Sequence, residues 1–222
     1  EFFRKLNYSV DYVGNPSVDS VAYYKEHQAI PKDTFIKEEG LADKHPRLAI
    51  GSRKQEIKDN LPTMLKVASA YPDYQPVIAG APGIDPAYYQ EYIGSYPAKI
   101  VFGKTYPLLQ HSAAAGNPGT ATLETALFRV PQVVCYYVVA GQLASFIFKH
   151  FFHTKYISLV NLIGGREIVQ ELFGARFSES QIQDELGLSY KIQPIKTNAK
   201  GYDEIIHTLG MPGLQAYGTA NR

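Results

Sequence analysis

The stretch GNPGTATLETALFRVPQVVCYY, residues 116–137, places a glycine-containing turn and a short helical pattern directly before an apolar strand pattern. Asparagine caps helices well and proline is tolerated at the first helical position, so Asn117 and Pro118 predict a helix that begins here. The run PQVVCYYVVA that follows has the length and the β-branched content of a buried strand. A helix next to a short buried strand is the repeating unit of a parallel α/β sheet.

The same alternation of patterns extends from this stretch towards both ends of the chain. Strands are expected in RLAIGS, YQPVIAGAPG, AKIVFGK and KYISLVNLI. Helices are expected in a piece around residues 18–27 and in RKQEIKDNLPTMLKVASAY, PAYYQEYIG, GQLASFIFKHFFH, REIVQELFG, SESQIQDELG and a short piece in DEIIHTLG. Pro62 should kink its helix or begin a second one. The predicted fold class is therefore α/β, with a Rossmann-like parallel sheet and helices on both faces.

Regularity also suggests how the chain is divided. Residues 1–46 are rich in turn signals and are interpreted as an initial strand and a crossover segment. Residues 47–187 carry the regular alternation and are expected to form one Rossmann-like domain, a fold that binds ligands at the carboxyl ends of its strands. Residues 188–222 have no clear period beyond a short helix and are interpreted as a carboxyl-terminal tail.

Composition excludes several classes of function. The formal net charge of +1 gives no support to a protein that binds nucleic acid through a broad basic surface. A single cysteine, Cys135, rules out a disulfide framework and is expected to be a buried packing residue. The six histidines show no metal-ligand spacing, so no metal site is expected. No apolar run reaches the length of about 20 residues that a membrane-spanning helix needs, so a cytoplasmic protein is expected.

The helix start after Asn117 is a candidate anion site. Backbone N–H groups at a helix start suit a phosphate, and Gly119, Thr120 and Thr122 would supply N–H groups and hydroxyls. Glu124, about one turn into the helix, is placed to accept hydrogen bonds from ribose hydroxyls. The alternative is an ordinary capped helix whose acidic residue favours its own dipole.

A similar arrangement follows the first predicted strand. Ser52 and Gln55 form a capping-box signature, and Arg53 offers a planar guanidinium that can bind a diphosphate. The alternative is a solvated arginine paired with Glu56. No GxxxxGK[ST] motif occurs, which disfavours a P-loop ATPase.

The third candidate lies in SLVNLIGGREIVQEL, residues 158–172. Asn161 is expected at the end of a strand, where its amide could bind a ligand. Glycines 164 and 165 would then let the backbone turn before Arg166 opens a helix and supplies a second cation. The alternative for Asn161 is a turn residue.

These three segments, in this order, resemble the lipid A disaccharide synthase family. The motifs GSRKQEI, GTATLETAL with PQVV after it, and KYISLVNLIGGREIVQEL are similar to motifs in the carboxyl-terminal half of that family over roughly residues 8–187. The resemblance implies the two-Rossmann-domain (GT-B) architecture, with the donor nucleotide bound by the carboxyl-terminal domain.

The resemblance also implies an activity and a set of roles. The family transfers 2,3-diacylglucosamine from its UDP derivative to 2,3-diacylglucosamine 1-phosphate and releases UDP, without a cofactor or metal. Ser52, Arg53, Gly119, Thr120, Thr122, Glu124, Asn161 and Arg166 would then bind the donor, with Arg53 and Asn161 also taking part in catalysis.

The same resemblance implies where such an enzyme works and what it meets. It would act as a peripheral protein at the cytoplasmic face of the inner membrane of a Gram-negative bacterium. Its partners would be the UDP-diacylglucosamine donor, the lipid monosaccharide acceptor and the membrane surface, and a homodimer is an allowed assembly. The alternatives left open are a nucleotide-sugar-binding fragment without turnover and another UDP-sugar transferase or epimerase of the same architecture.

Overall fold

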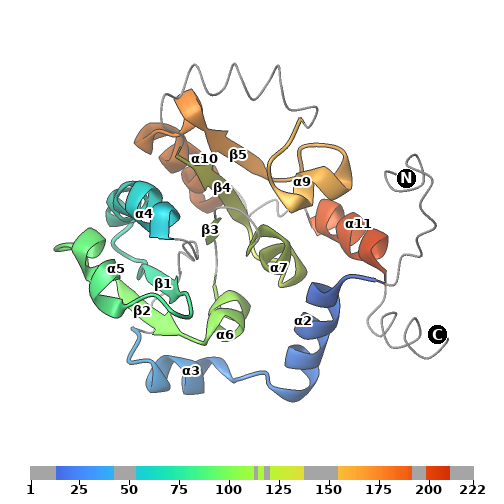
Figure 1. The fold of residues 1–222 in the computed structure, drawn as a ribbon, viewed down its shortest axis with the longest axis horizontal. Coiled ribbons are helices and arrows are strands. Elements are labelled where there is room, and N and C mark those ends of the chain that lie inside the picture. Colours follow the sequence, from blue (N-terminus) through green and yellow to red (C-terminus); the bar gives the residue numbers. More distant parts are fainter. Residues whose placement is uncertain are drawn as a thin grey trace.

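Helices and strands alternate along most of the chain (Figure 1). The computed structural model describes residues 14–42, 54–112, 115–117, 121–137, 155–191 and 199–210. In chain order the elements are α2 (Pro16–His27), α3 (Lys32–Glu38), α4 (Lys54–Ser69), β1 (Val77–Gly80), α5 (Pro86–Ile93), β2 (Lys99–Phe102), α6 (Thr105–Gln110), β3 (Ala115–Asn117), α7 (Ala121–Leu127), β4 (Gln132–Tyr136), α9 (Leu159–Gly164), β5 (Gln170–Phe173), the 3₁₀ turn η1 (Gly174–Arg176), α10 (Glu179–Lys191) and α11 (Ala199–Leu209).

Every strand pair among the described residues is parallel. Strand β1 pairs with β2, with Val77 opposite Lys99. Strand β4 lies between β3 and β5, and its Val133 is in register with Gly116 and with Gln170. Parallel strands need crossover connections, and helices supply them here, which confirms the α/β class predicted from the sequence.

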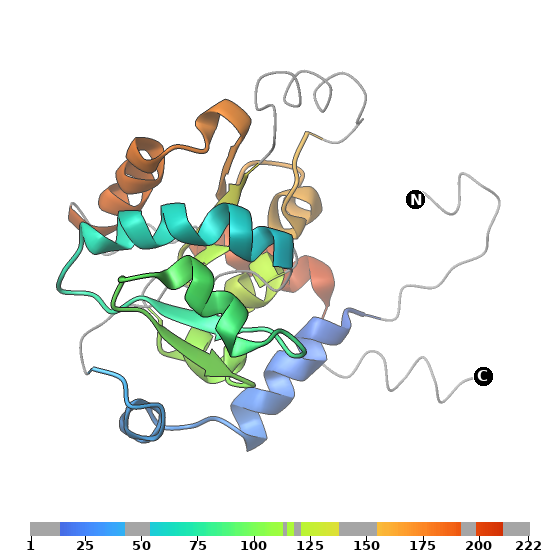
Figure 2. The ribbon, with the colours of Figure 1, turned by 60° about the vertical axis from the view of Figure 1, so that its left-hand side comes forward.

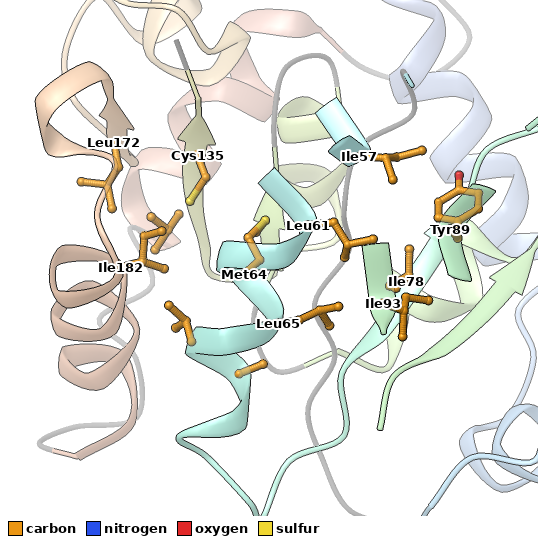
Figure 3. Close-up of a cluster of buried hydrophobic side chains, with 13 residues drawn as sticks. Ile57, Leu61, Met64, Leu65, Ile78, Tyr89, Ile93, Cys135, Leu172 and Ile182 are labelled. Atoms are coloured by element: carbon orange, nitrogen blue, oxygen red, sulfur yellow. The ribbon is translucent and has the colours of Figure 1, made fainter. Parts of the chain in front are cut away.

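Helices cover both faces of the strands. Along β4, Val133 and Cys135 join one hydrophobic cluster, with side chains from α4, α5 and α10 (Figure 3). Val134, between them, joins a second cluster with side chains from α2, α7, α9 and α11. Since neighbouring residues of a strand point to opposite faces, both faces of β4 are buried. Figure 1 shows α4 and α5 on one side of β3 and β4 and α7, α9 and α11 on the other.

A third cluster closes the end of the molecule that holds β1 and β2. It joins Phe35 of α3 to Val77, Val101 and Leu108 from β1, β2 and α6. Figure 2 shows α2 and α3 running along this lower side of the molecule. The sequence predicted only connecting residues around Lys32–Glu38, so helix α3 was missed, and the buried ring of Phe35 explains why it forms.

Local caps explain several predicted helices. The side chain of Asn15 accepts a hydrogen bond from the Ser17 backbone N–H at the start of α2, and Pro16 stands at the first position. Asp85 does the same for α5, at 2.8 Å from the Ala87 nitrogen. Helix α4 continues through Ser69 as a single helix with Pro62 inside it. The predicted helices around residues 18–27 and in PAYYQEYIG are confirmed.

Residues 155–174 fold in the opposite order to the one predicted. The strand expected in KYISLVNLI is wrong, because Ser158 caps helix α9 there and accepts a hydrogen bond from the Asn161 backbone N–H at 3.2 Å. The helix ends at Gly164, and the next residue, Gly165, has a φ of +63°, a left-handed conformation that favours glycine. The helix expected in REIVQELFG is also wrong, because strand β5 and η1 occupy that segment.

Two boundaries differ from those expected. Asn117, predicted to cap the helix after it, is the last residue of β3, and α7 begins at Ala121. Helix α10 extends to Lys191, and α11 packs Tyr202, Ile205 and Leu209 into the second cluster. The predicted elements in residues 1–13, 47–53 and 138–154 lie outside the described residues, and the division into domains stays a prediction.

Candidate functional site at the carboxyl ends of the strands

Two helix starts meet where parallel strands end. Helix α6 follows β2 after two residues, and α7 follows β3 after three. Helices that follow strands in this way begin at the carboxyl ends of the strands, where open α/β sheets bind ligands. Tyr106 lies in the first turn of α6 and Glu124 in the first turn of α7. The candidate site is therefore built around these two residues.

Glu124 and Tyr106 are joined by a hydrogen bond. The Tyr106 hydroxyl donates to Oε1 of Glu124 at 3.1 Å. Burial raises the pKa of the Glu124 carboxyl above its usual value, and the hydrogen bond from Tyr106 offsets part of that rise. Burial and the adjacent carboxylate raise the pKa of Tyr106 to about 12, so its hydroxyl remains a donor at neutral pH. A half-buried carboxylate held in this way can accept hydrogen bonds from ligand hydroxyls.

Thr122 does not fit the role expected for it. Its side chain is completely buried, and its carbonyl accepts a hydrogen bond from the amide of Gln132 at 2.9 Å. A hydroxyl that donates to a ligand at the protein surface would need an exposed position. Ser52, Arg53, Gly119 and Thr120, the remaining residues of the first two candidate sites, lie outside the described residues.

Asn161 uses its whole side-chain amide inside the protein. Nδ2 donates to the Val169 carbonyl at 2.8 Å and to Oε1 of Glu171 at 2.9 Å. Oδ1 accepts from the backbone N–H groups of Ile168 at 2.7 Å and Val169 at 2.9 Å. An amide has two donor hydrogens and two acceptor lone pairs, and all four are occupied. The side chain, fully buried, joins α9 to β5 and leaves no hydrogen-bonding capacity for a ligand.

Glu171 completes this network from the middle of β5. Its carboxylate accepts hydrogen bonds from the backbone N–H groups of Ile157 at 2.9 Å and Ser158 at 2.8 Å, in addition to Asn161. A buried carboxylate is tolerated because backbone and amide donors surround it. Asn161 and Glu171 together fix the start of α9 against the strand.

Arg166 lies at the other end of the sheet from Glu124. Because α9 precedes β5, the loop that carries Arg166 leads into the amino end of that strand. The guanidinium donates to Oε2 of Glu204 on α11 at 2.6 Å, and Arg129, in the loop that leads into β4, pairs with Asp203 of the same helix. The sequence placed Arg166 near the nucleotide because it predicted a strand followed by a helix. The structure has a helix followed by a strand, so the basis for that placement is absent.

The described residues hold no other arrangement that suggests a metal or a nucleophile. No group of three histidine, cysteine or acidic residues that could hold a metal ion occurs among them. Cys135 is completely buried, and burial raises the pKa of its thiol to about 12, which confirms it as a packing residue. None of the described helices combines the length and apolar composition needed to cross a bilayer.

Comparison with known proteins shows the family. The sequence model described as lipid-A-disaccharide synthetase matches residues 1–210. The chain belongs to the lipid-A-disaccharide synthetase family. The lipid-A-disaccharide synthase of Myxococcus xanthus is 32% identical over 195 residues, which cover 84% of this chain and 49% of that protein. The enzyme of Solibacter usitatus is 30% identical over 192 residues, covering 83% and 48%. This chain thus spans about half the length of these curated relatives.

Solved structures support the fold class. The UDP-GlcNAc 2-epimerase of Neisseria meningitidis, determined bound to UDP-GlcNAc, matches with a TM-score of 0.57 and 15% identity over 94% of this chain and 53% of that one. A glycosyltransferase from Rickettsia africae matches with a TM-score of 0.55 and 11% identity, covering 90% and 53%. These likenesses show a Rossmann-like domain of the GT-B architecture.

Two residues of this family member were missed from the sequence. Tyr106 stands four residues after β2, at the carboxyl end of a predicted strand, and this position could have marked it. Glu171 and Gln170 interrupt the apolar residues of IVQELF, so the segment lacked the pattern of a buried strand. Its backbone and amide donors come from residues 157–161, so no local pattern could have indicated that it is buried.

Proposed function

We propose that this chain forms the donor-binding half of a glycosyltransferase of lipid A biosynthesis. The enzyme would transfer 2,3-diacylglucosamine from its UDP derivative to 2,3-diacylglucosamine 1-phosphate, forming a β-1,6 linkage and releasing UDP. The observation that carries the proposal is the family match over residues 1–210. The site adds a half-buried carboxylate, Glu124, at the ligand-binding end of a Rossmann-like sheet.

The donor would be held by groups around the starts of two helices. Glu124 would accept hydrogen bonds from the ribose hydroxyls of UDP. Ser52, Arg53, Gly119 and Thr120 are proposed for the diphosphate, because a guanidinium and helix-terminal N–H groups both favour phosphate oxygens. Asn161 is proposed as a residue that positions α9 rather than one that contacts the donor.

Transfer would depend on electrostatic stabilisation of the departing UDP. The acceptor hydroxyl attacks the anomeric carbon of the donor sugar, the bond from that carbon to the diphosphate breaks, and a base takes the hydroxyl proton. Negative charge then grows on the diphosphate, where Arg53 and helix N–H groups would stabilise it without a metal ion. The family resemblance assigns the general base to the amino-terminal half of the relatives, which work as peripheral proteins at the inner membrane.

The second candidate is a nucleotide-sugar-binding protein without turnover, because a carboxylate held at the carboxyl ends of the strands would serve nucleotide binding whether or not transfer follows. One experiment separates the two. UDP binding and disaccharide synthesis are measured on the same folded sample of this chain, alone and joined to the amino-terminal half of the Myxococcus xanthus relative. We expect UDP binding in both samples and synthesis only in the fusion, since the acceptor must be held against the donor between two domains. A fusion that binds UDP but forms no product would favour the binding protein.

A further inference from the structure

The contact between Tyr106 and Glu124 joins two helices that are consecutive in the fold. Tyr106 comes from the start of α6 and Glu124 from the start of α7. The hydroxyl donates to one carboxylate oxygen, Oε1, at 3.1 Å. A carboxylate offers about four acceptor positions, so this bond restricts its rotation and leaves acceptor positions on both oxygens.

An aromatic cluster fixes the ring that carries this hydroxyl. The ring of Tyr106 packs at 5.4 Å between centroids against both Tyr24 and Phe128, and these two rings lie 5.8 Å apart. Lys25 lies over the Phe128 ring and donates to the Leu127 carbonyl at 2.9 Å, which ties α2 to the end of α7. The Tyr106 hydroxyl is therefore held in place before any ligand binds.

We propose that Tyr106 is a positioning residue that aims the Glu124 carboxylate at the vicinal hydroxyls of a bound nucleoside and so sets a preference for ribose over 2′-deoxyribose. This inference rests on the proposed function, because it takes Glu124 as the group that accepts from the ribose. Two neighbouring hydroxyls can donate to both oxygens of one carboxylate only when its plane is correctly turned. Preorganised acceptors lose less entropy on binding, so a fixed orientation of the carboxylate increases the affinity.

The test compares two nucleotides that differ by one hydroxyl. UDP and 2′-deoxy-UDP are titrated into the chain by calorimetry, and the ratio of their dissociation constants measures the use of the 2′-hydroxyl. In the unaltered chain we expect UDP to bind about tenfold more tightly than 2′-deoxy-UDP, as for a hydrogen bond to a charged group. In Tyr106→Phe we expect the dissociation constant of UDP to rise about fivefold and that of 2′-deoxy-UDP to change less than twofold. The preference for UDP over 2′-deoxy-UDP should therefore fall.

Tyr24→Phe is the matched control. Its hydroxyl belongs to the same aromatic cluster but donates to Oε1 of Gln110, the last residue of α6, at 2.8 Å. Removing it should leave the ratio of the two nucleotides unchanged. Glu124→Gln should lower the ratio, and adding Tyr106→Phe to it should have no further effect, because the positioned carboxylate is already lost.

The outcomes separate this inference from the proposed function. A folded chain that does not bind UDP contradicts the proposed function, and the inference falls with it. UDP binding with the same ratio in Tyr106→Phe as in the unaltered chain overturns the inference alone. A Tyr106→Phe chain that no longer folds also overturns it, because the hydroxyl would then serve the fold and not the ligand.

Discussion

The amide of Asn161 donates a hydrogen bond to the buried carboxylate of Glu171 at 2.9 Å, and this contact joins helix α9 to strand β5. Both side chains are almost completely buried, and each is surrounded by partners from the same segment of chain. The polar residue that the sequence marks as a ligand contact thus holds together the protein itself.

Replacement of Asn161 by alanine should destabilise the fold. It would remove the amide oxygen that accepts from the Ile168 and Val169 N–H groups and the amide donor to Glu171, at a cost of about 3 kcal/mol or roughly 6–12 °C in Tm. Thermal unfolding followed by circular dichroism measures the change. Asn60 is equally buried and accepts one bond, from the Tyr137 N–H, among the described residues, so Asn60→Ala should cost less. Loss of UDP binding in Asn161→Ala at unchanged Tm would show instead that Asn161 contacts the ligand.

Glu124→Gln should raise the stability of the fold and lower the affinity for UDP. The folded-state pKa of Glu124 lies above its ordinary value of 4.5, so stability from this group is lost as pH rises from about 4.5 through the raised pKa. Glutamine removes that cost, so we expect a higher Tm than in the unaltered chain at pH 7, and a difference that shrinks as the pH is lowered. UDP should bind about fivefold less tightly, because a neutral amide accepts more weakly than a carboxylate.

An exposed glutamate provides the control for this variant. Glu167→Gln, in the loop that leads into β5, should change neither Tm nor UDP affinity. A Glu124→Gln chain with unaltered UDP affinity would remove Glu124 from the nucleotide site.

The pair formed by Arg166 and Glu204 should contribute little to stability. Both side chains are about half exposed, and exposed ion pairs are typically worth about 0.2–1 kcal/mol. A double-mutant cycle with Arg166→Gln and Glu204→Gln measures the coupling by denaturant unfolding.

UDP affinity should change less than about twofold in Arg166→Gln, because the residue lies at the amino end of β5. A tenfold loss of UDP affinity at unaltered stability would return Arg166 to the donor site.

The sequence predicted most of the fold where local signals agreed with the final structure. The helix predicted in PAYYQEYIG begins at Pro86, as α5 does, and the apolar run at Val77–Gly80 marked β1. Both depend on residues next to each other in the chain, so a local pattern was sufficient.

Prediction failed in residues 155–174, for one local and one distant reason. The apolar residues of KYISLVNLI favoured a strand, although Ser158 caps a helix of six residues there and the left-handed Gly165 follows its last residue. Glu171 made the next segment look helical, although donors from residues 157–161 keep it buried in a strand. Because helix and strand occur in the reverse of the predicted order, Arg166 lies at the opposite end of the sheet from the predicted position. Glu124 was proposed for the site from its position in the sequence alone, whereas its hydrogen bond with Tyr106 on α6 became apparent only from the structure.

Arg53→Ala should weaken the binding of UDP by about 1.5–3 kcal/mol, because a charge-assisted contact with the diphosphate would be lost. Calorimetric titration with UDP measures the loss. Lys58→Ala removes an exposed cation from α4 and should leave the affinity unaltered. Equal affinities in Arg53→Ala and Lys58→Ala, both folded, would exclude Arg53 from the site.

Titration of the unaltered chain with UDP in the presence of EDTA tests the central claim most directly. The groups proposed for the diphosphate are a guanidinium and backbone N–H groups, so binding should need no divalent cation. We predict saturable binding of one UDP per chain, with the same affinity in EDTA and in magnesium. A folded chain that gives no binding heat with UDP in either condition, or that binds only when magnesium is present, would contradict the account.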